Sequence, residues 1–380
     1  MKRETISARP GWQDTVAAQG LIYHTIDGVE LWNESACYHF TRAQIEQIAV
    51  AAEQCHAMCI AAVDAVIGEK LWDLIGIPER YRALVTRSWQ RREKHLYGRF
   101  DFAYDGNFAP KLLEYNADTP TALIEAAVTQ WYWMKDVRPN TDQFNSLHED
   151  LIARWGAMGL LKGGLVHFTS MDTLEDLMTC GYLRDTAEQA GLTSERLSIG
   201  SVGWDLNRRV FVDEQMRNIS TCFKLYPWEW MFSDSFGANV EAGSTRWLEP
   251  AWKSILSSKG ILAVLHTLFP NSPYILPASL KPMTGHVVKK PLRSREGSNV
   301  EISRFGLIVE QSDGPYAPVG GDDEIAFVWQ KAVELPVFDG MRPIMGVWMI
   351  GDKASGLGIR EDDSRITSNL SPFVPHYFTR

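Results

Sequence analysis

The stretch that most constrains the fold is residues 99–116, which read RFDFAYDGNFAPKLLEYN. Apolar and polar residues alternate on both sides of a central DGN break, and this pattern predicts a β-hairpin with a short turn. If the strands fold symmetrically about the break, Asp101 faces Glu114 and Arg99 faces Asn116, because both pairs of numbers have the same sum. Since strand side chains alternate between two faces, we expect all four polar side chains on one face.

This polar face is suited to a magnesium site beside a phosphate group. The side chains of Asp101, Glu114 and Asn116 supply two carboxylates and an amide oxygen. These are hard ligands of the kind Mg²⁺ takes, and the ion completes its shell with water and phosphate oxygens. Arg99 lies beside them and is suited to contact a transferred phosphoryl group. The alternative interpretation is an exposed strand face with a surface ion pair.

Composition indicates a soluble globular protein. The chain has 380 residues, of which 45% are hydrophobic and 22% charged, so it can bury a large core. The net charge of −9 and the lack of a basic block argue against a nucleic-acid or membrane surface. The first residues, MKRETISARPGW, lack the apolar run of a signal peptide, and no run of about 18 apolar residues is seen. We therefore expect a cytoplasmic protein, with no indication of its oligomeric state.

The five cysteines form no paired CxxC motif. Cys55, His56 and Cys59 are the nearest approach to a metal cluster. They lie in an Ala-rich helical stretch, which favours buried packing over zinc binding.

The segments next to the hairpin are predicted to be helical. Residues 1–40 read as an irregular arm, 41–67 as a long amphipathic helix capped by Thr41, and 75–89 as a further helical pattern. We expect these segments to form an N-terminal helical layer on the sheet.

After the hairpin, Thr119-Pro120-Thr121 is expected to open a helix over residues 122–133, with Thr121 as its cap. A helix start directly after a metal-type strand is a natural anion site, although an ordinary cap explains the same residues.

An alternation of strands and helices follows. Strands are predicted at 164–170, 197–202 and 209–212, and a helix at 174–190. This order indicates an α/β sheet with ligand sites at its strand ends. Glu175 and Asp176 open the helix. Acidic residues are ordinarily favoured there by the helix dipole; the functional interpretation is a docking point for a substrate amine.

Residues 287–300, VVKKPLRSREGSNV, form the second informative stretch. A strand ending at Lys290 runs into a basic, glycine-containing loop over 293–299, and strand character resumes over 300–309. Such a loop exposes backbone N–H groups and can cover a triphosphate. Neither GxxxxGK[ST] nor GxGxxG spacing is present, and basic hairpin loops are common.

The remaining patterns complete a single intertwined domain. Strands are predicted at 324–330 and 343–350, before the motif GLGIRE. The aromatic stretch 223–231 is typical of a core or a lid edge. Residues 247–270 read as helical, with Lys259 beside a helix break, where a lysine is by default solvated.

Several motifs, in order, resemble the synthetase part of the glutathionylspermidine synthase family, a branch of the ATP-grasp ligases. They are GRFDFAYDG, LLEYNADTPT, SSKGIL with LFPNSPYILPA, KKPLRSREGSNV, and IGDKASGLGIREDDSRITSNLSPFVPH. The resemblance covers nearly the whole chain and implies an α/β (α+β), ATP-grasp-like fold. It implies an N-terminal arm and helices over 1–90, the metal-site hairpin and a substrate-binding region over 91–240, and a nucleotide-binding region over 241–380. Residues 1–90 have no room for the cysteine amidase of bifunctional members.

The resemblance also implies roles by position. Asp101, Glu114 and Asn116 match the Mg²⁺ ligands, and Arg99 the catalytic arginine at the transferred phosphate. The ATP-binding residues that it implies are Arg99, Lys259, Lys290, Arg295, Gly297, Gln330 and Arg360. The substrate residues that it implies are Thr119, Thr121, Glu175 and Asp176. The family has serine at the two threonine positions, and Asp176 is a departure from its acidic pair.

The implied activity is that of an ATP-dependent carboxylate–amine ligase with ATP and Mg²⁺ as cofactors. ATP phosphorylates a carboxylate of glutathione or a similar peptide, and an amine or polyamine then attacks the acyl phosphate to form an amide. The alternative is an ATP-binding, weakly ATP-hydrolysing interaction or sensor module, suggested by the absent amidase and the altered substrate positions. A hydrolase using Cys55 and His56 is a third hypothesis.

Overall fold

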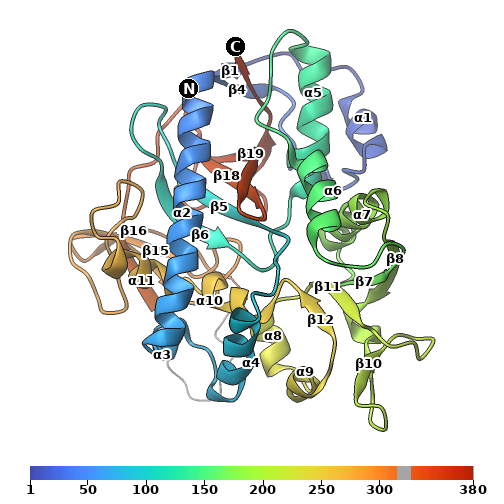
Figure 1. Ribbon diagram of the computed structural model, residues 1–380. Coiled ribbons are helices and arrows are strands. Elements are labelled where there is room, and N and C mark those ends of the chain that lie inside the picture. The colour runs from blue at the N-terminus through green and yellow to red at the C-terminus, as the bar shows by residue number, and fades with distance from the viewer. Residues whose placement is uncertain (315–326, 380) are drawn as a thin grey trace.

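A five-stranded antiparallel sheet at the centre of the molecule carries the hairpin (Figure 1). The computed structural model describes residues 1–314 and 327–379. The strand order is β20-β19-β18-β5-β6. The strands are β5 (Tyr97–Ala103), β6 (Lys111–Asn116), β18 (Arg342–Ile350), β19 (Lys353–Asp362) and β20 (Phe373–Val374). Nearly every residue of β5, β18 and β19 is buried, so this sheet is covered on both faces.

The register predicted for the hairpin is confirmed. Arg99 lies opposite Asn116, and Asp101 opposite Glu114, with a bulge directly after Asp101. The expected short turn is wrong, because the connection between the strands runs over residues 104–110.

Some of the helices pack on the central sheet. The helices are α1 (Trp12–Ala18), α2 (Arg42–Gly68), α3 (Trp72–Ile75), α4 (Glu79–Gln90), α5 (Gln130–Val137), α6 (Leu147–Ala157), α7 (Leu174–Gln189), α8 (Trp228–Ser233), α9 (Gly237–Ala242), α10 (Ser254–Ser257) and α11 (Ile261–Leu268), with a π-helical stretch at Glu125–Thr129 and 3₁₀ turns at Ile199–Ser201 and Ala251–Lys253. Among them, α2 and α6 pack on the central sheet, whereas α7 packs on β7 (Leu165–Ser170) and β8 (Thr193–Ser198). The expected N-terminal helical layer is confirmed for α2, which crosses the sheet and contacts β18 and β19 (Figure 1).

Helix α2 begins where the sequence predicts. The Thr41 hydroxyl accepts a hydrogen bond from the Gln44 backbone N–H at 3.3 Å, and the Gln44 side chain accepts one from the Thr41 N–H at 3.0 Å. This is a capping box, which satisfies two N–H groups of the first turn. Among the described helices, α2 has the length and composition of a membrane span, but one face of it, including Ile48, Cys55 and Cys59, is buried in the hydrophobic core.

A four-stranded parallel sheet forms the second layer, with the order β12-β11-β7-β8. Its strands are β7 (Leu165–Ser170), β8 (Thr193–Ser198), β11 (Thr221–Leu225) and β12 (Arg246–Leu248). The strand at 164–170 and the helix at 174–190 are confirmed as β7 and α7. The strand expected at 197–202 is wrong, since the chain leaves β8 at Ser198. The strand at 209–212 is instead β10 (Val210–Val212), in a separate hairpin with β9 (Gly203–Asp205).

A second five-stranded antiparallel sheet has the order β13-β17-β14-β15-β16. Its strands are β13 (Ala278–Ser279), β14 (His286–Pro291), β15 (Glu301–Arg304), β16 (Leu307–Gln311) and β17 (Phe327–Lys331). The predicted basic loop therefore joins β14 to β15, which confirms the strand–loop–strand interpretation. Strand β17 accounts for most of the strand predicted at 324–330, whose residues 324–326 lie outside the described part of the chain.

Two sequence expectations about irregular and helical segments are wrong. The first 40 residues are not an irregular arm, because β1 (Lys2–Thr5) and β4 (Ala36–Thr41) pair with each other and β4 pairs with β21 (His376–Thr379). A small hairpin of β2 (Thr25–Ile26) and β3 (Val29–Glu30) also lies there. Residues 247–270 contain the end of β12, a 3₁₀ turn and two short helices rather than one helix.

Candidate active site

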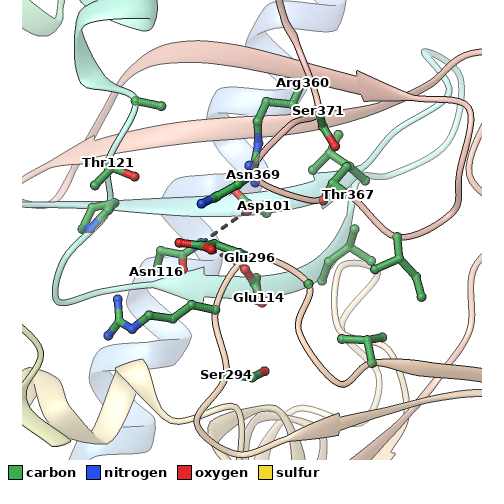
Figure 2. A pocket seen from close by; sticks show the side chains of 18 of the residues that line it. Asp101, Glu114, Asn116, Thr121, Ser294, Glu296, Arg360, Thr367, Asn369 and Ser371 are labelled. Atoms are coloured by element: carbon green, nitrogen blue, oxygen red, sulfur yellow. Dashed lines mark hydrogen bonds between the residues drawn. The ribbon is translucent and has the colours of Figure 1, made fainter. Parts of the chain in front are cut away.

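A cavity of about 810 Å³ opens between the hairpin, the sheet around β14 and the start of α7. Figure 2 shows part of its lining, with the hairpin side chains facing residues of the basic loop and of the C-terminal segment. Every residue that the sequence nominated for the site lines this cavity: Arg99, Asp101, Glu114, Asn116, Thr119, Thr121, Glu175, Asp176, Lys259, Lys290, Arg295, Gly297, Gln330 and Arg360. The fold thus brings together residues from most of the length of the chain.

The four polar side chains of the hairpin form one hydrogen-bonded cluster. The Arg99 guanidinium donates to the two carboxylate oxygens of Asp101 at 2.7 and 3.1 Å. The Asn116 amide donates to Asp101 at 3.3 Å and to Glu114 at 3.2 Å. Arg99 and Asp101 are only 9% and 4% exposed, so the alternative of an exposed strand face is wrong.

Two lysines approach this cluster from other elements. The Lys259 Nζ lies 3.1 Å from the Glu114 carboxylate and donates to the Ser294 carbonyl at 2.8 Å. Its side chain is 10% exposed, so the solvated position expected by default is wrong. Lys290 donates to the side-chain oxygen of Gln330 at 2.9 Å, which fixes its direction.

The charges around Glu114 keep its carboxylate ionised. Burial opposes ionisation, but Lys259 and Lys290 lower the pKa of Glu114 to about 2. Burial lowers the pKa of Lys290 to about 8, although Glu114 acts in the opposite direction. This corner of the cavity therefore combines hard oxygen ligands with cations suited to phosphate oxygens.

The basic loop lies across the cavity and reaches the segment after the hairpin. Arg295 donates to the Thr119 hydroxyl at 2.7 Å and to the Glu229 carboxylate at 2.9 Å, and its guanidinium lies 5.6 Å from the centre of the Trp230 ring. The loop thus ties β14 and β15 to the end of the hairpin.

Gly297 brings the same loop against the C-terminal segment. Its backbone has a φ of +69°, and a Cβ there would lie 2.3 Å from the Thr367 carbonyl oxygen. Only glycine fits so close a backbone approach. Figure 2 shows Thr367, Asn369 and Ser371 beside Arg360. These C-terminal residues line the cavity and were not nominated from the sequence.

An acidic group of side chains lines another part of the cavity. Glu175 and Asp176 lie in the first turn of α7, where the Thr173 hydroxyl caps the Asp176 N–H at 3.3 Å. Burial, together with the neighbouring Glu175, raises the pKa of Asp176 to about 7.

Glu125 is a further acidic residue of the cavity that the sequence reading missed. It begins the π-helical stretch, is 3% exposed and accepts a hydrogen bond from the Tyr23 hydroxyl at 2.9 Å. Burial, with Glu175 adding to it, raises the pKa of Glu125 to about 7. π-Helical turns recur at functional sites. A single carboxylate within the apolar run ALIEAAV was the signal that could have identified it.

The cap predicted at Thr121 is wrong. Ala122 has a φ of +67°, and the helical backbone begins only at Leu123. The Thr121 carbonyl instead accepts a hydrogen bond from Arg99 at 3.0 Å. This contact ties the chain after the hairpin to the buried arginine.

The fold as a whole is similar to that of a glutathione synthetase-like effector from Globodera pallida. The TM-score is 0.58 and the identity 11%, over 97% of this chain and 96% of that one. The architecture is thus the mixed helix-and-sheet fold of glutathione synthetase-like proteins, as the sequence motifs predict.

The chain belongs to the glutathionylspermidine synthase family, since residues 3–379 match the family described as "Glutathionylspermidine synthase preATP-grasp". A Haemophilus influenzae protein named "Putative acid--amine ligase" is 38% identical, over the full length of both chains. The trypanothione synthetase of Crithidia fasciculata is 28% identical over 88% of this chain, which spans 57% of that relative. The family and these relatives define an ATP-dependent carboxylate–amine ligase. The predicted family and ligase class are confirmed, and the alternative of a binding module is not favoured.

Proposed function

We propose that the protein uses ATP to join a carboxylate of glutathione or a similar peptide to an amine or polyamine, and that it does so in the cytoplasm. One observation carries the proposal: a single cavity holds both a cationic, carboxylate-bearing corner suited to ATP and an acidic part suited to a cationic amine. The names of relatives, trypanothione synthetase and glutathionylspermidine synthase, support this substrate class.

Asp101, Glu114 and Asn116 would hold Mg²⁺. The ionised Glu114, the neighbouring carboxylate of Asp101 and the amide oxygen of Asn116 suit this hard cation. When bound, the ion would supply positive charge that offsets the negative charge of the ATP phosphates.

The cationic side chains of the cavity would act on the transferred phosphoryl group. Lys259, Lys290 and Arg99 offset the negative charge that develops as the γ-phosphate leaves ADP and bonds to the substrate carboxylate. Arg295, Gly297 and the rest of the loop cover the acyl phosphate and exclude water, while Gln330 holds Lys290 in place. Arg360 adds a further cation near the phosphates, beside the C-terminal segment.

The acidic side chains would receive the amine. Glu175, Asp176 and Glu125 attract its positive charge, but only the neutral amine attacks the acyl phosphate. A carboxylate whose pKa is near 7 is suited to take up the proton that the amine loses. The amine nitrogen then bonds to the acyl carbon, and the phosphate leaves. Thr119 and Thr121 border the region where the donor peptide would lie.

We further propose one functional domain with three regions, as the sequence suggested. Residues 1–90 form the supporting arm and helices, 91–240 bind the metal and the substrates, and 241–380 bind the nucleotide. The cavity takes most of its lining from the last two regions and adds Tyr23, Ile26 and Leu31 from the first, which supports one domain built from all three.

The test measures ADP release by the purified protein with Mg-ATP, with and without glutathione plus a pool of amines, and analyses the products by mass spectrometry. We expect amine-dependent ADP release and a product whose mass equals donor plus amine minus water. Release of ADP that no donor or amine stimulates, with no such product in any pool, would contradict the proposed substrates.

A further inference from the structure

A second cluster of potential ligands lies outside the cavity of the ligase. His56 comes from the middle of α2, His95 from the segment just before β5, and Asp352 from the turn between β18 and β19. None of the three lines the ligase cavity. The cluster therefore joins three segments that are far apart in the sequence, and the ligase reaction assigns it no role.

The three side chains converge on one point. The Nε2 atoms of His56 and His95 lie 3.0 and 3.1 Å from the same oxygen, Oδ1 of Asp352. All three ligand atoms lie within 4.8 Å of one another. A metal ion binds such ligand atoms at about 2.0–2.1 Å. At octahedral or tetrahedral angles, two of its ligand atoms then lie about 2.9–3.4 Å apart. The two nitrogen–oxygen separations therefore match those of a metal site.

The surroundings of the cluster suit an ion with an open side. His56 and His95 are 3% and 6% exposed, whereas the Asp352 side chain is 77% exposed. Water can thus reach the carboxylate side and complete the coordination. Neither imidazole Nδ1 has a hydrogen-bond partner within the described residues, so no contact prevents either ring from presenting the lone pair of its Nε2.

The neighbouring backbone holds the ligands in place. The Gly351 N–H donates to the Leu96 carbonyl at 2.8 Å, which fixes the turn of Asp352 against the segment of His95. The ring of His95 contacts that of Trp252 edge-on, with centroids 5.4 Å apart. This rigidity reduces the entropy that metal binding must overcome.

Two imidazoles and one carboxylate select for a particular kind of ion. Imidazole nitrogen suits zinc, cobalt and nickel, whereas magnesium and calcium prefer oxygen ligands throughout. We propose that His56, His95 and Asp352 bind one divalent first-row transition-metal ion such as Zn²⁺, with water completing its shell. The ion ties α2 to the end of the sheet from which β5 carries Arg99 and Asp101 into the ligase cavity.

The test is calorimetric titration of Zn²⁺ into chelator-treated protein, together with thermal unfolding with and without the ion. We expect one Zn²⁺ per chain and a higher Tm in its presence. Asp352→Asn and His95→Asn should each weaken Zn²⁺ binding by more than about tenfold and abolish the shift in Tm. Asp352→Asn changes an exposed side chain, so its fold should be retained.

Matched variants separate this site from other carboxylates. Asp73→Asn, at an exposed aspartate, and His266→Asn, at a histidine of α11, should bind Zn²⁺ as the parent does. Glu114→Gln removes a ligand of the proposed magnesium cluster and should also leave Zn²⁺ binding intact. Loss of binding in Glu114→Gln but not in Asp352→Asn, or an absence of stoichiometric binding in the parent, would overturn the proposal.

Discussion

Among single residues, Asp101 is the one on which the proposed chemistry depends most. Its carboxylate holds Arg99 by two hydrogen bonds and is a proposed Mg²⁺ ligand. Asp101→Asn keeps the shape but removes the charge, so we expect kcat for amide formation to fall by about 10² or more. Asp105→Asn is the matched control on the same hairpin: Asp105 accepts backbone hydrogen bonds from Asn107 and Phe108, which an asparagine oxygen can also accept. Unchanged kcat in Asp101→Asn would contradict the assigned role.

Glu125 predicts a pH dependence of stability. Its pKa in the folded chain is raised to about 7, above that of an unfolded glutamate, so the native state holds a proton that the unfolded state has lost. The resulting stabilisation is complete below the unfolded pKa and is lost as the pH rises through about 7. Between pH 5 and 8 this one group should cost about 2 to 3 kcal/mol of unfolding free energy.

The neutral variant Glu125→Gln isolates this effect. Because glutamine does not titrate, the stability of the variant relative to the parent should rise by that amount from pH 5 to pH 8. Urea unfolding at each pH measures the difference. Glu46→Gln, at an exposed position of α2, serves as the control, and parallel pH profiles for the parent and Glu125→Gln would refute the shifted pKa of Glu125.

The individual site residues show what local sequence can and cannot predict. The hairpin cluster could be predicted because apolar and polar residues alternate along both strands and the strands pair symmetrically about the DGN break. Both features can be read from the local sequence. Glu125 could not be assigned in this way, because its raised pKa depends on burial and on Glu175, which lies in another element. Lys259 was misjudged for the same reason: its partner Glu114 belongs to another element.

Among the elements, the loop between β14 and β15 is expected to control whether ATP turnover leads to product. In Gly297→Ala the new Cβ would meet the Thr367 carbonyl, so the loop cannot close on the C-terminal segment. We expect KM for ATP to rise about tenfold or more, which corresponds to about 1.4 kcal/mol of binding free energy. We also expect more ADP to form for each amide made. Assays of both products in the same reaction measure this ratio.

The control for the loop is Gly285→Ala. Gly285 also has a positive φ, +98°, but nothing lies within 4 Å of its Cβ position. Both variants therefore add backbone strain, but only Gly297→Ala adds the clash with Thr367. Equal ADP-to-amide ratios in the two variants would show that closure against Thr367 is unimportant.

Helix α2 offers a prediction about stability alone. Thr41→Ala removes the hydroxyl that accepts the Gln44 N–H, and should lower the unfolding free energy by about 1 kcal/mol. Thr41→Ser keeps the hydroxyl and should recover most of the loss. Chemical unfolding of the three proteins tests this, and an undiminished stability of Thr41→Ala would show that the capping box contributes little.

Elements stabilised by contacts between residues near in sequence could be predicted more accurately than elements that depend on distant segments. Helix α2 and the strands β7, β14 and β18 carry strong local patterns and form where they are expected. By contrast, β1 and β4 are completed by β21 from the other end of the chain, a pairing that no local pattern encodes. The apolar content of residues 247–270 is typical of a helix. The helical backbone is nevertheless interrupted near Gly260, which lies too close to the Leu74 backbone for a residue with a Cβ.

In the molecule as a whole, the cavity links the layers of the fold, so nucleotide binding should stabilise them together. Its lining comes from the hairpin, from β14 and β17, and from the start of α7. A non-hydrolysable ATP analogue with Mg²⁺ at about 100 times its Kd should therefore add about 2.7 kcal/mol to the unfolding free energy of a single calorimetric transition. In the parent, a chelator that removes Mg²⁺ should reduce this gain in unfolding free energy. In Asp101→Asn, the gain should be the same with and without the chelator. If the parent instead unfolds in two transitions and the analogue moves only one of them, the nucleotide-binding region is an independent unit and the proposed single domain is wrong.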